Sequence, residues 1–512
     1  MNLNKNYTRL LVLIIFCVFI IAKIAPAQNN LQEGITAVKN GNYLKALELL
    51  KPVVNTEKTY EGYYYYGYAL FKTGSLSDAE KYEKLAIDKD NERPEAFSAI
   101  GEIYSAQKKF NDAENSFETA RQYIPLNKPK SDLEPQEIAL IVEVLSREAE
   151  NFIAEGTPEK IDKATTSLSI AKTYDNNNPL LLSGLGDSYR SRGVFDLATT
   201  NYNAALAIKP FAPAYFGLGE IAFHYKKFND ALDFFSKAKT TDPNYADPYF
   251  ESGLILYLSD QIDLALESFD KFAQLKPGST KGKTYIAKCL YAQGLRAEGL
   301  NKKEDAEKYF TDAMQLLDSV LTVDPKSNEA NKYKAYIYIE RKDYQLALDY
   351  FNKVDEKSFD SEDWRKIAQI YVNQKEFYKA YDYYNKSLAS DSTDENTYFE
   401  YGKAQFNNAE YESSLRNFDK SIDLGLGTRN IGVYVYKGLV LYYLKSYDSA
   451  IVWFQKPLEV DPKLALSYQW IGNCYAAIGG KKNEACDAYK KCIALDPTNQ
   501  DVLDQIKLFG CQ

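Results

Sequence analysis

A small residue recurs along almost the whole chain at a nearly constant interval. Most steps between successive positions are 33–36 residues long, and three longer steps measure 51, 41 and 41 residues. A period near 34 residues predicts a stack of helical hairpins, in which each hairpin buries its apolar face against its neighbours. Such a stack favours binding over catalysis. The recurring residues are Ala46, Ala79, Ala113, Ala164, Ala198, Ala231, Ala265, Ala306, Ala347, Ala380, Ser414, Ala450 and Ala485.

Three further positions keep the same register. A glycine usually stands twelve residues before the small residue, as at Gly219. Because both residues of this pair are small, the two antiparallel helices of a hairpin can approach closely. A large apolar side chain stands four residues after it, as at Phe235, where we expect it to fill the gap between one hairpin and the next. Proline stands twelve residues after it in six units, as at Pro243, and ends the second helix. Glu83 departs from the pattern, because it takes the aromatic position in the second unit.

With these positions the chain resembles the tetratricopeptide repeat (TPR) family over roughly residues 31–500. One unit matches the family pattern almost position by position: Tyr215, Leu218, Gly219, Ala222, Ala231, Phe235, Ala238 and Pro243. The resemblance implies an all-α, right-handed solenoid of about thirteen helix-turn-helix repeats. The register divides the chain into a cleaved signal peptide (1–27), repeats 1–3 (28–127), a divergent longer hairpin (128–178), repeats 5–7 (179–278), a second longer hairpin (279–325), repeats 9–13 (326–498) and a C-terminal capping helix (499–512).

The first residues have the features of an export signal. Lys5 and Arg9 precede an apolar run from Leu10 to Ala22, and Ala25-Pro26-Ala27 follows as a small-residue cleavage site. The run is shorter than the ~20 residues that a spanning helix needs. We therefore expect cleavage after Ala27, no stable membrane span afterwards, and a periplasmic or peripherally envelope-associated protein; an uncleaved anchor is the alternative.

Composition argues against several classes of function. The chain has 62 Lys+Arg against 71 Asp+Glu and no basic run, so we expect no nucleic-acid partner. His224 is the only histidine, and no His/Cys cluster accompanies it, so we expect no enzyme activity, no metal site and no cofactor. Residues 278–284 (Gly-Ser-Thr-Lys-Gly-Lys-Thr) approach a phosphate-binding loop, but the spacing is one residue short and a helix precedes them. A turn between repeats is the better interpretation.

The TPR resemblance also implies which first-helix positions line the inner groove: three residues before the glycine and one, four and five after it. Many of these positions are aromatic, and aromatic anchors in a concave groove suit an extended peptide or a helix. We therefore expect a protein-protein interaction scaffold for protein partners of the cell envelope. Two alternatives stay open: tight coiling that buries the rings, and a carbohydrate-capture protein whose rings stack on sugars. The predicted groove residues are Tyr64, Tyr68, Phe71, Phe216, Phe223, Phe250, Tyr257, Phe399, Phe406 and Tyr442.

Four of the six cysteines lie in the last 39 residues: Cys474, Cys486, Cys492 and Cys511. In an oxidising compartment such clustering suggests disulfides that staple the terminal repeat. Four cysteines allow three pairings. We expect Cys474–Cys486 and Cys492–Cys511, with four buried thiols as the alternative.

Overall fold

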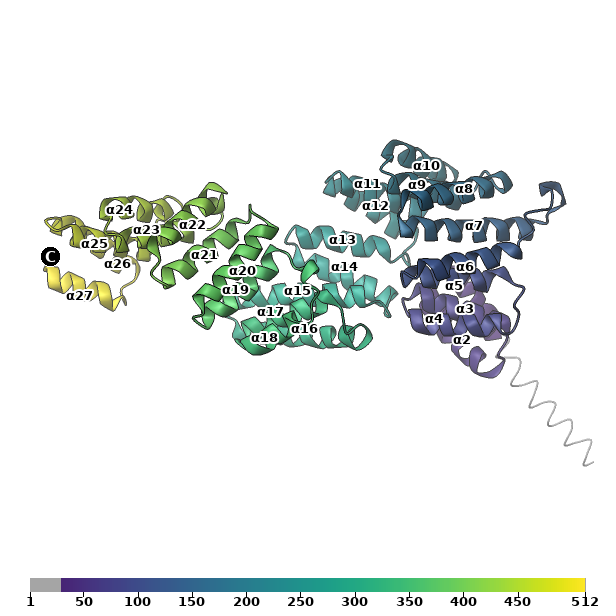
Figure 1. Cartoon of the computed structure of the whole chain (residues 1–512), viewed down its shortest axis with the longest axis horizontal. Helices are drawn as coiled ribbons and strands as arrows, with labels where there is room; N and C mark the ends of the chain where they lie inside the picture. The colour runs from purple at the N-terminus through teal and green to yellow at the C-terminus, as the bar shows by residue number, and fades with distance from the viewer. Residues whose placement is uncertain (1–28, 512) are drawn as a thin grey trace, which may run out of the picture. The chain divides into compact units, whose positions relative to one another are not determined.

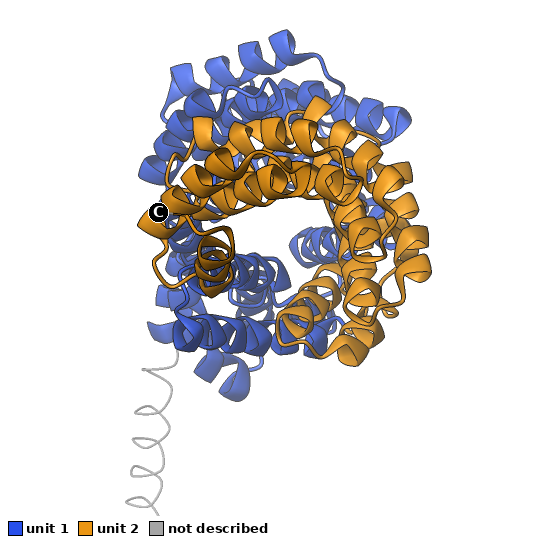
Figure 2. Ribbon diagram, turned by 90° about the vertical axis from the view of Figure 1, so that its left-hand side faces the viewer, with its two compact units in different colours: residues 1–324 blue, residues 325–512 orange. Residues whose placement is uncertain are grey.

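The computed structural model describes residues 29–511, and every regular element in that range is a helix. The predicted signal peptide lies outside the described residues. The chain divides into two compact units, residues 1–324 and 325–512, and each is described by itself (Figure 2). The sequence register did not anticipate this division.

Unit 1 contains eight hairpins, the first of which begins with a helix at residues 29–39. Its other helices are α2 (Tyr43–Thr56), α3 (Tyr60–Lys72), α4 (Leu76–Ile87), α5 (Pro94–Ala106), α6 (Phe110–Gln122), α7 (Pro135–Glu155), α8 (Pro158–Tyr174), α9 (Pro179–Ser191), α10 (Phe195–Ile208), α11 (Ala212–His224), α12 (Phe228–Thr241), α13 (Asp247–Leu258), α14 (Ile262–Leu275), α15 (Thr280–Gly299) and α16 (Lys303–Val323), with a 3₁₀ turn at Lys130–Asp132 (Figure 1).

Unit 2 contains five hairpins and a terminal helix, and its hairpins follow an arc (Figure 2). Its helices are α17 (Asn328–Glu340), α18 (Tyr344–Phe351), α19 (Ser361–Asn373), α20 (Phe377–Ser390), α21 (Glu395–Asn407), α22 (Tyr411–Asp423), α23 (Gly432–Tyr443), α24 (Tyr447–Gln455), α25 (Ala465–Ile478), α26 (Lys482–Leu495) and α27 (Gln500–Phe509), with 3₁₀ turns at Glu356–Ser358, Leu426–Thr428 and Lys456–Glu459. The predicted all-α solenoid of thirteen hairpins is confirmed.

A left-handed residue in the turn of every hairpin reverses the chain. In the sixth hairpin Lys226 has φ = 57°, and the N–H of Lys227 donates to the carbonyl of Ala222 at 2.9 Å. This bond pattern closes the C-terminus of a helix in a Schellman-type turn. Lysine or glycine takes the left-handed position in most hairpins, and only glycine does so without steric cost.

The recurring small residue is buried in all thirteen hairpins. The glycine of the first helix lies directly under the large side chain of the second: a Cβ added to Gly219 would come within 2.4 Å of Phe235. The aromatic ring therefore packs on the glycine of its own hairpin as well as on the next hairpin, where the sequence predicted only the second contact. Ser414 replaces alanine without leaving an unsatisfied group, because its hydroxyl donates to the carbonyl of Gly402 at 2.7 Å.

The C-terminal disulfide joins Cys486 to Cys511, whose Cα atoms lie 5.3 Å apart, so the predicted pairs are wrong. Helix α27 packs antiparallel on α26, and Cys511, two residues beyond the end of α27, therefore reaches Cys486 in the second turn of α26. Cys492 lies near the opposite end, 3.9 Å from the side-chain nitrogen of Asn499. Cys474 packs into the core between α24 and α25. Cys474 and Cys492 are buried free thiols.

Among residues 29–511 no helix combines the length and the apolar character that a membrane span requires.

Candidate functional site

Unit 1 closes on itself, so hairpins far apart in the sequence touch. The N–H of Gly278, in the turn after α14, donates to the carbonyl of Thr73 at the end of α3 at 3.0 Å. The two turns pack backbone to backbone, since a Cβ on Gly278 would come within 2.6 Å of the Gly74 and Ser75 main chain. The segment that approaches a phosphate-binding loop is therefore the turn that closes the unit, followed by the start of α15.

The closed unit surrounds a cavity of about 1540 Å³, which we call the chamber. Its wall comes from α3, α5, α7, the start of α9, the turn before α13, and the α14–α15 turn. Two of its lining residues, Leu180 and Val323, are also exposed on the surface, so the chamber is open to solvent. It exceeds the 300–1,000 Å³ typical of small-molecule pockets, and its size suits a polypeptide segment.

A buried ion-pair network spans the N-terminal side of the chamber. Glu102 lies 3.0 Å from Nζ of Lys72 and 3.2 Å from Nε of Arg147, which also pairs with Glu143. Burial acts to raise the pKa of Glu102, but the charges of Lys72 and Arg147 hold it below its ordinary value. The network therefore stays charged, and it fixes the side chains that line this part of the wall.

Cations lie against two of the aromatic rings that line the chamber, those of Tyr68 and Phe71. Lys72 lies 4.9 Å from the centre of the Tyr68 ring and 4.7 Å from that of Phe71, and Arg147 lies 4.7 Å from that of Tyr68. Nearby, Lys281 lies 3.6 Å from the centre of the Phe250 ring. The Tyr68 and Phe71 rings of the chamber wall therefore already interact with cations of the protein.

Of the ten predicted groove residues, only Tyr68 and Phe71 line the chamber. The structure corrects the expectation for Tyr64, Phe250 and Phe399, which are buried. All three stand three residues before the glycine position, where the ring faces neighbouring helices instead of the groove. Phe250, for example, packs on Phe269 of its own hairpin and on Tyr285 of the next.

The remaining five predicted residues, Phe216, Phe223, Tyr257, Phe406 and Tyr442, are partly buried. In unit 1 the Phe216 ring packs on Phe235 and Tyr245, and the Phe223 ring packs on Phe228. In unit 2 the Phe406 ring packs on Tyr411, Tyr436 and Tyr443, and the Tyr442 ring packs on Tyr447 and Trp470. In unit 2 these contacts make a continuous row of rings along α21, α23 and α25. The row joins successive hairpins.

Sequence reasoning missed most of the chamber wall. Arg147 and Glu150 lie on α7, inside the longer hairpin where the 34-residue register is interrupted, so no repeat position identifies them. Tyr43 begins a second helix and Tyr245 lies in a turn, so neither occupies a predicted groove position. Arg147 stands among Glu143, Glu148 and Glu150 in the sequence, so its charge did not mark it as a wall residue either.

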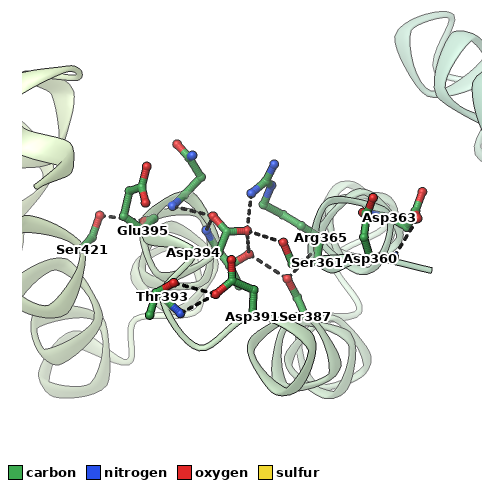
Figure 3. Close-up of polar contacts among 12 residues, drawn as sticks. Asp360, Ser361, Asp363, Arg365, Ser387, Asp391, Thr393, Asp394, Glu395 and Ser421 are labelled. Atoms are coloured by element: carbon green, nitrogen blue, oxygen red, sulfur yellow. Dashed lines mark hydrogen bonds and ion pairs between the residues drawn. The ribbon is translucent and has the colours of Figure 1, made fainter. Parts of the chain in front are cut away.

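In unit 2 a cluster of polar side chains surrounds Asp394, the residue that caps α21 (Figure 3). Its carboxylate accepts from Ser361 at 3.0 Å and from Arg365 at 2.7 Å, both on α19, and from the backbone and hydroxyl of Thr397. Burial acts to raise the pKa of Asp394, but the Thr397 hydrogen bond and the Arg365 charge hold it below its ordinary value. With its acceptors occupied, this carboxylate joins two hairpins and offers nothing to a ligand.

Comparison with known proteins identifies the repeats. Tetratricopeptide repeat models match residues 31–94, 183–246, 291–361, 364–394 and 466–499. The chain belongs to the tetratricopeptide repeat family. The TPR repeats support a role as a protein-protein interaction scaffold.

A TPR repeat-containing protein of Methanocaldococcus jannaschii is 24% identical over 313 residues, which cover 61% of this chain and 49% of that protein. The chain thus spans about half the length of the curated relative that it matches.

Among solved structures, the APC/C hetero-tetramer Cut9–Hcn1 superposes with a TM-score of 0.44 at 14% identity, over 93% of this chain and 95% of that one. Yeast Tom70 superposes with a TM-score of 0.33 at 17% identity, over 86% of this chain and 99% of that one. MamA superposes with a TM-score of 0.26 at 26% identity, over 31% of this chain and 91% of that one.

Proposed function

We propose that this TPR protein is an exported, non-catalytic scaffold that binds extended segments of envelope proteins in the chamber of unit 1. The observation that carries the proposal is the chamber itself: a solvent-open cavity of about 1540 Å³ whose wall is fixed by buried ion pairs. A wall held in place in this way loses little freedom when a partner binds.

Two further features support export. The N-terminal sequence has the composition of a cleaved signal. The Cys486–Cys511 disulfide suits an oxidising compartment such as the periplasm, because disulfides are rare in the cytosol.

Carbohydrate capture, the alternative from the sequence, suits the chamber less well. Sugar rings stack on free aromatic faces, and the faces of Tyr68 and Phe71 are next to Lys72 and Arg147. A sugar would have to displace these cations from buried ion pairs with Glu102.

Site-specific photocrosslinking in the native envelope tests the proposal. A photoreactive phenylalanine analogue replaces Phe71 in the chamber wall, and the control carries it at Leu197, which is exposed on α10. We expect the Phe71 position to crosslink to one contiguous segment of a partner protein, mapped by mass spectrometry, and the Leu197 position not to do so. Adducts only with glycan, or equal protein adducts at both positions, would contradict the proposal.

A further inference from the structure

Helix α7 presents a stripe of side chains to the chamber. Ile138, Val142, Ser146 and Glu150 recur every fourth residue, and all line the cavity. The stripe begins with apolar side chains and ends with a carboxylate. At 1.5 Å per residue it is about 18 Å long.

Glu150, Asp78 and Lys283 are the charged residues of the wall whose side chains form neither an ion pair nor a hydrogen bond within residues 29–511. The side chains of Lys72, Arg147 and Lys276, in contrast, each form an ion pair with a carboxylate. Glu150 is exposed, yet protein surrounds it, because its exposed surface faces the chamber. The charged and titratable groups that influence it come from four first helices and one turn: Lys72 (α3), Glu102 (α5), Arg147 (α7), Asp187 (α9) and Tyr245 (before α13).

The chamber has more acidic than basic groups: seven Asp and Glu side chains line it, against five Lys and Arg. Lys72 is the cation with the largest effect on the pKa of Glu150, and it already forms an ion pair with Glu102. A ligand that brings its own positive charge would therefore complement Glu150, whereas an anionic ligand would meet an excess of like charge.

We propose that the chamber binds an extended peptide segment that places an apolar side chain on Ile138 and Val142 and a lysine or arginine on Glu150. This inference rests on the proposed function and adds the chemistry of the segment. An extended chain advances about 3.3 Å per residue, so the ~18 Å stripe corresponds to a spacing of about five or six positions from one anchor residue to the other. The apolar anchor contributes burial, and the cation sets direction and register.

The same geometry makes binding depend on pH. Burial, and then the charge of Glu102, raise the pKa of Glu150 to about 7. A cationic side chain pairs with the ionised carboxylate, so protonation below that pKa opposes binding. The affinity should fall by up to about tenfold per pH unit below 7 and level off above it.

Fluorescence anisotropy with three labelled peptides tests the inference on the mature protein. Each has leucine at one end and a variable residue six positions later, with glycine and serine between, and the variable residue is lysine, glutamine or glutamate. The proteins are the wild type, Glu150→Gln, and the control Glu159→Gln, an exposed residue of α8. We expect the lysine peptide to bind at least tenfold more tightly than the glutamate peptide. Glu150→Gln should remove most of that difference and its pH dependence, and Glu159→Gln should not.

Equal binding of the lysine and glutamate peptides, no effect of Glu150→Gln, or no binding of the lysine peptide would overturn the inference. The pH profile of the wild type provides a readout that needs no variant. Crosslinking of a native partner at Phe71 together with any of these failures would reject the basic anchor and retain the scaffold function. Failure at Phe71 itself would reject the scaffold function.

Discussion

At the scale of single residues, the fold depends on the contact between a glycine and a ring. The glycines of the first helices lie so close to the large side chain of the second helix that any Cβ would overlap it. The distance between the two helices of a hairpin is therefore set by the absence of a side chain at one position.

We expect Gly219→Ala to destabilise its hairpin by about 1–3 kcal/mol, because the new Cβ would lie 2.4 Å from Phe235 and the ring would have to move. Gly299→Ala is the matched control, since nothing lies within 4 Å of its added Cβ, and it should change stability by less than about 0.5 kcal/mol. Urea denaturation followed by circular dichroism measures both. Equal effects would show that the loss comes from something other than the ring contact.

Glu83 is the residue that departs from the aromatic position, and it is fully buried with no hydrogen-bond partner for either carboxylate oxygen. Burial raises its pKa well above the ordinary value, which favours the protonated carboxyl in the folded protein. Its contribution to stability is therefore complete below the unfolded pKa near 4.3 and is lost as the pH rises toward the folded pKa.

As the pH rises from 5, we expect the wild type to lose more stability than Glu83→Gln does. The difference should grow by about 1.4 kcal/mol per pH unit between the unfolded pKa and the raised folded pKa of Glu83. At pH 8 the variant should melt at the higher temperature, because glutamine has no charge to bury. Thermal denaturation at several pH values, with Glu159→Gln as the control, measures this. Parallel pH profiles for wild type and Glu83→Gln would contradict the assignment.

At the scale of elements, two turns do more than connect helices. The α14–α15 turn closes unit 1 through Gly278 and Thr73, and the C-terminus of α27 is bonded to the start of α26 through Cys511 and Cys486. In both cases an element contacts a part of the chain that the repeat pattern does not specify.

We expect Gly278→Ala to open the closure of unit 1 without unfolding its hairpins, since the added Cβ would lie 2.6 Å from the backbone of the opposite turn. Hydrogen exchange should become faster in residues 73–75 and 278–279 and stay unchanged in α9 and α10. Gly299→Ala again provides the control. Unchanged exchange at the two turns would show that the contact contributes little to the closed state.

We expect non-reducing peptide mapping to find Cys486 linked to Cys511, with Cys474 and Cys492 alkylated only after denaturation. Reduction should release α27, and the closed loop of about 25 residues implies a loss of about 3 kcal/mol for the cap. Limited proteolysis before and after reduction measures the release. A Cys492–Cys511 peptide in the native protein would contradict the structure.

At the scale of the whole molecule, two compact units follow one another along a single periodic sequence. The chamber belongs to unit 1 alone, whereas unit 2 has a row of rings that joins its hairpins. A solenoid can vary in this way, because each hairpin contacts mainly its neighbours and small rotations between hairpins accumulate.

We expect the mature protein to begin at Gln28, because the small-residue site ends at Ala27. Mass spectrometry of protein purified from its native compartment measures the N-terminus. An Ala27→Asp variant, which places a charged residue at the cleavage site, should accumulate uncleaved. Intact Met1 in the wild type would support an anchor instead.

The sequence alone determined what lies within one repeat. The positions of Gly219, Ala231 and Phe235 recur because each hairpin is packed by contacts between residues close in sequence, and such contacts leave a periodic pattern. The tertiary structure decided what happens between distant repeats. The closure of Thr73 on Gly278 and the exposure of Glu150 to the chamber depend on the accumulated rotation of many hairpins, and no single repeat encodes that rotation.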